Sequence, residues 1–277
     1  MATEAPTRAA AARPLLLCAD DFGLTPGIDQ AIAGLVRGGR LGAFSCLANG
    51  PAWRQDAGLV AGLRAQAQAG LHFNLTEGRP LSPALARHWP QLPSLGRLLL
   101  DAHLRRLPRA ALADELAAQW QAFVDASGGA PDFIDGHQHV HHLPGVREAL
   151  LAWLQRHPVP VRSTARLGGP GGRLKRWVIE HSGGRALARA LRQRGLPHNP
   201  LLLGAYDFQA GYRPLMQAWL AQVPAGGALL FCHPGQASPG DAPDAIAPAR
   251  QRELAYLASE AFAADLRAAG VVLAKRW

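Results

Sequence analysis

Residues 15–23 read Leu15-Leu16-Leu17-Cys18-Ala19-Asp20-Asp21-Phe22-Gly23, a short apolar run that ends in two adjacent carboxylates and a glycine. Such a run between turn-forming residues is typical of a strand that is buried on both faces of a parallel sheet. Two neighbouring aspartates are costly to bury unless a cation compensates them. One of them could simply cap the next helix, because Asp is a preferred N-cap residue. Whether the pair is a helix cap or part of a functional site therefore depends on which residues end the later strands.

Helices and strands alternate after this first predicted strand. Apolar residues at helical spacing predict a helix over Pro26–Arg37 and a second one over Trp53–Gln68. Short apolar runs at Ala43–Ala48 and Leu71–Thr76 predict the second and third strands. This βαβαβ order favours parallel strands that are joined by crossover helices.

The alternation resumes after a segment rich in Pro, Leu and Arg, Arg79–Pro108, that shows no clean period and is expected to be a long excursion. Helices are predicted over Ala110–Ala126, Gly145–Arg156, Tyr212–Gln222 and Ala249–Ala269. Strands are predicted from Phe133 into the histidine cluster that begins at His137, at Val159–Arg162, along the apolar run Gly226–Cys232, and at Val271–Leu273. No internal repeat or linker divides the chain. We therefore expect one domain over residues 14–277, preceded by a flexible N-terminal tail over residues 1–13.

Several predicted strands end in Asp or His, as in βα barrels, whose catalytic groups gather at the carboxyl ends of the strands. A lone His such as His72 is more often a core residue, but His137 begins a dense histidine cluster. On a regular strand, His137, His139 and His141 would share one face at intervals of about 6.6 Å. They could line one wall, but they could not all reach one ion. The candidate site residues at the strand ends are Asp20, Asp21, His72, Asp135, His137, His139 and His233.

Mixed carboxylate and imidazole ligands suit a divalent metal. Ligand type alone makes zinc, manganese, cobalt or iron plausible, and magnesium less expected. A site with three protein ligands leaves room for water and substrate, and bound water becomes a usable nucleophile near neutral pH. A second carboxylate beside the ligand could accept the proton of that water. This division of work would explain an adjacent Asp pair.

The net charge of the chain is large, but it is only weak evidence for an acidic partner. The 277 residues carry a formal net charge of +9, but only Lys175 and Lys275 among the 29 basic residues are lysines, so a bias in amino-acid usage also explains it. The stretch Arg162–Arg194 holds nine basic residues against the single acid Glu180 and includes the glycine-rich Gly168–Gly172, which predicts a mobile loop. It could be a lid that grips a polar or anionic substrate, or a solvated charged helix face, which we favour. We expect no nucleic-acid partner.

The cysteine content and the hydropathy indicate a soluble cytoplasmic protein. Cys18, Cys46 and Cys232 are too few and odd in number for a disulfide framework, which favours a reducing compartment. The first residues lack the apolar core of a secretory signal. No run reaches the length of a transmembrane helix.

Four motifs resemble, in order, those of the YdjC-like carbohydrate deacetylases. They are Ala19-Asp20-Asp21-Phe22-Gly23, Gly70-Leu71-His72-Phe73-Asn74-Leu75-Thr76, Asp135-Gly136-His137-Gln138-His139-Val140-His141 and Cys232-His233-Pro234-Gly235. The family includes chitooligosaccharide deacetylases and members associated with hopanoid biosynthesis. The likeness runs from residue 15 to the C-terminus and is specific to the family, but not to a substrate.

The resemblance implies a distorted (β/α) barrel of TIM-like type that removes an N-acetyl group from an acetylamino sugar with the help of a divalent metal. By position in the motifs, Asp20 is the expected general base and His233 the expected general acid, while Asp21, His72 and His137 are the expected metal ligands. Asp135, His139, Arg162, Arg250 and Glu253 are expected to support the site or bind substrate. The family is associated with magnesium, so the metal stays open between Mg²⁺ and Zn²⁺ or another transition metal. A homodimer is also expected from the resemblance.

The sequence is consistent with three alternative functions. The leading one is a metal-dependent hydrolase that deacetylates an oligosaccharide or a glycolipid. The second keeps the metal site but applies it to another amide or ester. The third is a basic protein that binds nucleic acid or anionic lipid through Arg162–Arg194, for which strong salt dependence would be diagnostic.

Overall fold

The computed structural model describes residues 12–170, 172–238, 241 and 243–277. The expected N-terminal tail lies outside the described residues up to position 11, and the first strand, β1, already begins at Arg13. Among the described residues, no helix combines the length and the apolar character that a membrane span requires.

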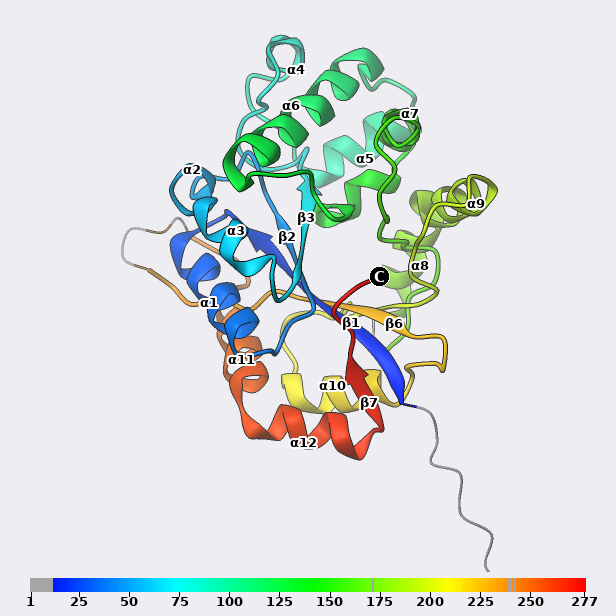
Figure 1. Cartoon of the computed structure of the whole chain (residues 1–277). Helices are drawn as coiled ribbons and strands as arrows, with labels where there is room; N and C mark the ends of the chain where they lie inside the picture. Colours follow the sequence, from blue (N-terminus) through cyan, green and yellow to red (C-terminus); the bar gives the residue numbers. More distant parts are fainter. Residues whose placement is uncertain (1–11, 171, 239–240, 242) are drawn as a thin grey trace, which may run out of the picture.

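A parallel sheet of seven strands forms the centre of the described structure (Figure 1). Its strands are β1 (Arg13–Phe22), β2 (Ala43–Cys46), β3 (Gln68–Phe73), β4 (Ile134–Gly136), β5 (Leu202–Leu203), β6 (Ala228–Cys232) and β7 (Val271–Leu273). The order across the sheet is β4-β3-β2-β1-β6-β5, and β7 pairs with the first residues of β1. Every named pairing is parallel, because helices connect the successive strands.

The sheet curls into a distorted TIM-like barrel that isolated bridges help to close. Val161 bridges both Ile134 of β4 and His198, and Leu167 bridges Leu202 of β5. This confirms the fold class expected from the sequence. The predicted strand at Val159–Arg162 is wrong as a regular strand, since Val161 contributes only single bridges there.

Helices surround the sheet, with α1 and α3 beside β1 and β2 and with α8 and α9 on the opposite side (Figure 1). The helices are α1 (Pro26–Arg37), α2 (Trp53–Asp56), α3 (Gly58–Leu63), α4 (Pro83–His88), α5 (Leu95–His103), α6 (Arg109–Ser127), α7 (Val146–Trp153), α8 (Arg173–Ile179), α9 (Arg185–Gln193), α10 (Tyr212–Leu220), α11 (Ala247–Ala258) and α12 (Glu260–Ala268). The apolar stripe of α1 packs inward because Ile28, Ile32 and Leu35 recur at helical spacing. The Thr25 side chain caps α1 by accepting a hydrogen bond from the Ile28 amide.

β1 lies at the centre of the sheet, and every residue from Leu15 to Phe22 is buried. Burial on both faces explains why its first half reads as an unbroken apolar run rather than as an alternating pattern. The predicted helix over Trp53–Gln68 is divided into α2 and the short α3. The two-residue strand β5 was not predicted, because so short a run carries no periodicity.

Two segments are more regular than the sequence suggests. The excursion Arg79–Pro108 contains α4 and α5, which begin at the capping residues Ser82 and Ser94. The basic stretch Arg162–Arg194 contains α8, the π-helical turn η2 (Glu180–Gly184) and α9. The prediction of a mobile loop at Gly168–Gly172 includes residue 171, which lies outside the described residues.

Candidate active site

The carboxyl ends of β1, β3 and β6 open into one cavity of about 1020 Å³. Six of the side chains expected from the sequence line it, namely Asp21, His72, His137, His139, His233 and Arg250. The residues lining this cavity do not include the other four, which are Asp20, Asp135, Arg162 and Glu253. The predicted residues therefore divide into a group that faces the cavity and a group that supports it from behind.

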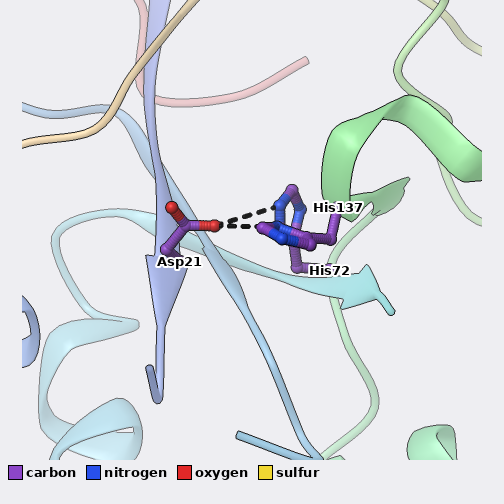
Figure 2. A group of neighbouring side chains, drawn as sticks. All are labelled: Asp21, His72 and His137. Atoms are coloured by element: carbon purple, nitrogen blue, oxygen red, sulfur yellow. Dashed lines mark hydrogen bonds and ion pairs between the residues drawn. The ribbon is translucent and has the colours of Figure 1, made fainter. Parts of the chain in front are cut away.

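Asp21, His72 and His137 form the centre of the cavity-facing group. The Asp21 Oδ1 atom lies 3.1 Å from His137 Nδ1 and 3.5 Å from His72 Nε2. Figure 2 shows both imidazole rings directed toward the Asp21 carboxylate. All three side chains are buried, and each offers one ligand atom within 4.8 Å of the others. One carboxylate and two imidazoles are a donor set that binds divalent metals, so the residues fit the metal that the family resemblance implies.

Local backbone geometry aims these side chains. Between Ala19 and Phe22 the pairing of β1 with β2 contains a bulge, and Asp21 has a φ of 72°. A left-handed φ is uncommon for a residue with a Cβ, and bulges re-aim side chains at strand ends. As a result Asp20 and Asp21 contact different partners although they are adjacent in the chain.

The histidine cluster is not a strand, which corrects the expectation that His137, His139 and His141 line one wall. β4 stops at Gly136, and residues His137–His142 form the 3-10 helix η1, in which Gln138 and His139 have positive φ. His141 instead meets the Arg162 carbonyl oxygen, with 2.8 Å between Nε2 and O. His139 lies against the Phe231 ring, and its Nδ1 has no hydrogen-bond partner among the described residues.

A second layer of polar side chains holds the two imidazoles and Asp21. His72 Nδ1 lies 2.6 Å from Asp135 Oδ1, and Ser45 Oγ donates to the same carboxylate oxygen. Arg250 donates to Asp21 Oδ2 at 2.8 Å. A carboxylate behind a histidine fixes its tautomer and its orientation, as outer partners commonly do at metal sites.

The charged groups around Asp21, His72 and His137 stabilise positive charge on the two imidazoles. Burial lowers the pKa of His72, but Asp135 and Asp20 more than offset it and raise that pKa to about 10. Burial likewise opposes protonation of His137, yet hydrogen bonds to Asp21 and Glu77 raise its pKa to about 9. Burial raises the pKa of Asp21, but the Arg250 guanidinium and the two histidines outweigh it and hold this pKa well below its usual value.

Arg162 organises the group behind the cavity. Its side chain is 0% exposed, and it donates from both terminal nitrogens to the two oxygens of Asp20 at 2.6 Å. One of these nitrogens, Nη2, also lies 2.6 Å from Asp135 Oδ2 and donates to Cys18 Sγ at 3.3 Å. Cys18, Asp20 and Asp135 could by their spacing hold a second ion. Because the guanidinium already contacts all three, it is the cation of this inner position.

His233 follows β6 and reaches the cavity from the other side. Its ring meets Phe208 and Phe231 edge-on, and its backbone N–H donates to Glu253 Oε2. Burial lowers the pKa of His233 to about 4, although Asp21 and Asp20 act in the opposite direction. Burial raises the pKa of Glu253 to about 7, against a hydrogen bond from Tyr206.

Among the polar residues that sequence reasoning missed, four contact the predicted site residues directly. Ser45 contacts Asp135, Glu77 lies 3.1 Å from His137 Nε2, Asp244 accepts from Arg250 Nε at 2.6 Å, and Tyr206 donates to Glu253. Ser45 and Glu77 had a usable signal, since each lies at or just after a predicted strand. Asp244 and Tyr206 lie in irregular segments without a pattern.

The comparison with protein families identifies the chain. The model of the YdjC-like proteins matches residues 14–268. This chain belongs to the YdjC-like family. The match covers all four motifs that carry the resemblance, and it includes every candidate site residue of this YdjC-like protein.

Relatives of this YdjC-like protein have names that refer to carbohydrate deacetylation. A mouse protein named carbohydrate deacetylase is 33% identical over 94% of this chain and 92% of its own length. A protein of Klebsiella pneumoniae named chitooligosaccharide deacetylase is 34% identical over 58% of this chain and 63% of its own length. A crystal structure from Enterococcus faecalis, described as that of a candidate cellobiose-phosphate cleavage protein, superposes with a TM-score of 0.73. It covers 95% of this chain and 97% of its own at 19% identity, and it supports the fold.

Proposed function

We propose that this YdjC-like protein is a metal-dependent hydrolase that removes the N-acetyl group from an acetylamino sugar. The observation that carries the proposal is the buried Asp21–His72–His137 cluster at the wall of a large cavity. The name of the mouse relative, which matches nearly the whole chain, supports the choice of reaction.

Asp21, His72 and His137 are the proposed ligands of the metal. A divalent ion held there would polarise the amide carbonyl and make water a stronger nucleophile near neutral pH. Magnesium follows from the family resemblance, whereas the two imidazoles favour zinc or another transition metal. Arg250 and Asp135 would keep the three ligands in place through Asp21 and His72.

Asp20 is the proposed general base. Arg162 orients its carboxylate through two hydrogen bonds. Asp20 lies behind the cavity lining, so this role requires that the attacking water reach Asp20 from the side of Asp21. His233 is proposed to deliver a proton to the departing amine. Its pKa of about 4 keeps the ring neutral at pH 7, so His233 has to receive this proton during turnover before passing it on.

The walls of the cavity favour a substrate with an apolar part. Leu95 and Leu99 of α5, Val178 and Ile179 of α8, and Phe231 line it together with the polar residues. Apolar contacts of this kind gain little from a bare sugar but stabilise an attached hydrocarbon group. We therefore propose a sugar-lipid, such as a hopanoid-linked amino sugar, as a second substrate class beside an N-acetylated oligosaccharide.

Acetate release tests the proposal directly. The purified protein is incubated with N-acetylglucosamine oligomers of increasing length, before and after removal of metal by a chelator and after addition of Mg²⁺ or Zn²⁺. We expect acetate to appear only in the metal-loaded samples. Full activity after metal removal would exclude the proposed mechanism, and release of acetate only from simple esters would favour the alternative of another ester or amide.

The cellular location, the oligomeric state and the absence of a nucleic-acid partner are further proposals. Cys18, Cys46 and Cys232 are buried and unpaired by disulfides, which supports a reducing location such as the cytoplasm. The homodimer rests on the family resemblance alone. Nucleic acid is not expected as a partner, and a filter-binding assay over a range of salt concentrations tests this.

A further inference from the structure

A second concave site lies apart from the catalytic cavity. It has a volume of about 370 Å³ and shares none of its lining residues with that cavity. Its charged lining is entirely cationic or imidazole, with four arginines and one histidine. These residues are Arg166, Arg185, Arg189, Arg192 and His198.

Three separate segments bring these side chains together. Arg185, Arg189 and Arg192 are spaced i, i+4 and i+7 and therefore occupy one face of α9. The opposite face of α9 is buried through Leu187 and Leu191, which fixes the orientation of the helix. Arg166 comes from the segment after Val161, and His198 from the segment before β5.

The floor of the site is ordered. Asn199 is buried and makes two hydrogen bonds to one backbone residue: its Oδ1 accepts from the Ser163 N–H at 2.7 Å, and its Nδ2 donates to the Ser163 carbonyl at 2.9 Å. These bonds join the segments that carry Arg166 and His198. The floor of the concavity is therefore formed by the fold itself, and exposed arginine side chains surround it.

The positive charge of this site is largely uncompensated. Arg185 pairs with Glu180 at 3.3 Å. Within the described part of the chain, the guanidinium groups of Arg166, Arg189 and Arg192 have no hydrogen-bond or ion-pair partner. Arg37 and Arg87 are also exposed and unpaired there, but they lie alone at the ends of α1 and α4. What distinguishes Arg166, Arg189 and Arg192 from other unpaired surface arginines is that they line one concavity from two separate segments.

We infer that this site binds a small anion that carries phosphate groups. Arginine presents a planar fork of donors that matches phosphate oxygens, and a concavity with one sign of charge concentrates ligands of the opposite sign. The volume lies in the range of small-molecule sites, about 300–1,000 Å³. A concave site of this size fits a small organic phosphate or diphosphate better than the flat face of a membrane. This inference is independent of the proposed deacetylase activity.

Calorimetric titration with inorganic pyrophosphate tests the inference on the metal-loaded protein. The variant Arg189→Gln/Arg192→Gln should bind the probe at least about tenfold more weakly than the wild type, a loss of about 1.4 kcal/mol. The matched control Arg37→Gln/Arg87→Gln removes the same charge from two exposed helix ends and should change the affinity less than about twofold. The single variant Arg166→Gln should also weaken binding, because the Arg166 side chain lines the same site from a segment outside α9.

The alternatives give distinct results. If pyrophosphate instead binds to a metal in the catalytic cavity, its affinity will be unchanged by the α9 substitutions. That result would overturn the inference. Equal losses in both double variants would show attraction by overall charge only and would also overturn it. Cosedimentation with anionic phosphatidylserine vesicles provides the last arm: binding to vesicles through Arg189 and Arg192, without binding of pyrophosphate, would assign the arginines to a lipid headgroup and exclude a small-molecule site.

Discussion

Asp20 and Asp21 are adjacent residues with different surroundings. Asp20 is held by Arg162 behind the cavity, whereas Asp21 faces the cavity with His72, His137 and Arg250 around it. The bulge in β1 and the left-handed φ of Asp21 produce this separation. The sequence alone suggested two roles for the pair, and the structure gives the two carboxylates different partners.

Substitution of each aspartate should therefore have a different effect. We expect Asp20→Asn to retain the metal but to lower kcat by about 10²–10⁴-fold, the usual contribution of a general base. Asp21→Asn should lose the metal, because it removes the charged ligand. Metal analysis of the purified variants together with acetate release checks both results. Loss of metal in Asp20→Asn with retention in Asp21→Asn would reverse the assignment.

The Asp135 carboxylate should influence the metal without touching it. It lies 2.6 Å from His72 Nδ1 and is itself held by Ser45 and Arg162. We expect Asp135→Asn to weaken metal affinity by roughly 10–100-fold, since outer partners of this kind orient the ligating imidazole. Competition with a metal-binding dye measures the change. Ser45→Ala should show a smaller loss in the same direction, and unchanged affinity in both variants would contradict the role of this layer.

At the level of elements, one buried carboxylate joins β1 to α1. Asp29 in the first turn of α1 is 0% exposed, and its Oδ1 accepts from the Gly23 N–H at 2.6 Å. Burial, together with the neighbouring Asp56 carboxyl, raises the pKa of Asp29 to about 8. The folded protein therefore favours the protonated form of Asp29 at neutral pH.

This junction predicts a pH dependence of stability. A carboxyl group with a raised pKa in the folded state stabilises the fold most below its unfolded pKa of about 3.9, and this stabilisation is lost as the pH rises toward about 8. In wild type, Asp29 should lower the free energy of unfolding by up to about 1.4 kcal/mol per pH unit between these values. Asp29→Asn keeps an oxygen for Gly23 but cannot ionise, so its slope should be flatter. Urea unfolding between pH 5 and 8.5 measures both slopes, and parallel curves would contradict the prediction.

The histidine cluster shows where element prediction from sequence reached its limit. Gly136-His137-Gln138-His139 contains no proline and no recognisable cap, so nothing local marks the end of the strand. The strand ends because Gln138 and His139 adopt left-handed φ values. His141 is then buried against the Arg162 carbonyl, whereas His142 lines the cavity and contacts Thr164 and Ser182. Such dihedral angles depend on tertiary contacts, which sequence periodicity does not report.

The helices α5 and α8 form apolar walls of a cavity whose proposed catalytic and metal-binding groups come from the strand ends. Leu99 lines this cavity, whereas the neighbouring Leu100 does not and is 55% exposed. The two positions on one helix offer a matched pair for testing the apolar part of the proposed substrate.

We expect an acetylamino sugar with an alkyl group to be hydrolysed with a higher kcat/KM than the same sugar without it, by up to about fourfold for each methylene that is buried. Leu99→Gln should reduce this preference, and Leu100→Gln should leave it unchanged. Acetate release from a series of alkyl glycosides provides the measurement. A flat series in the wild type would restrict the proposal to oligosaccharides without a lipid.

Sequence patterns were enough to predict the fold class, the family and the set of strand-end residues, because burial on both faces leaves an unbroken apolar run and because ionisable residues follow directly at its carboxyl end. The prediction of parallel strands around Leu15–Gly23 is confirmed. The folded structure was needed to tell which of those residues share the cavity and which support it from behind. His72, His137 and Arg250 meet Asp21 from positions between about 50 and 230 residues away in the chain. Such distances, together with the bulge that separates Asp20 from Asp21, result from the curvature and the register of the complete sheet, and no local pattern encodes either.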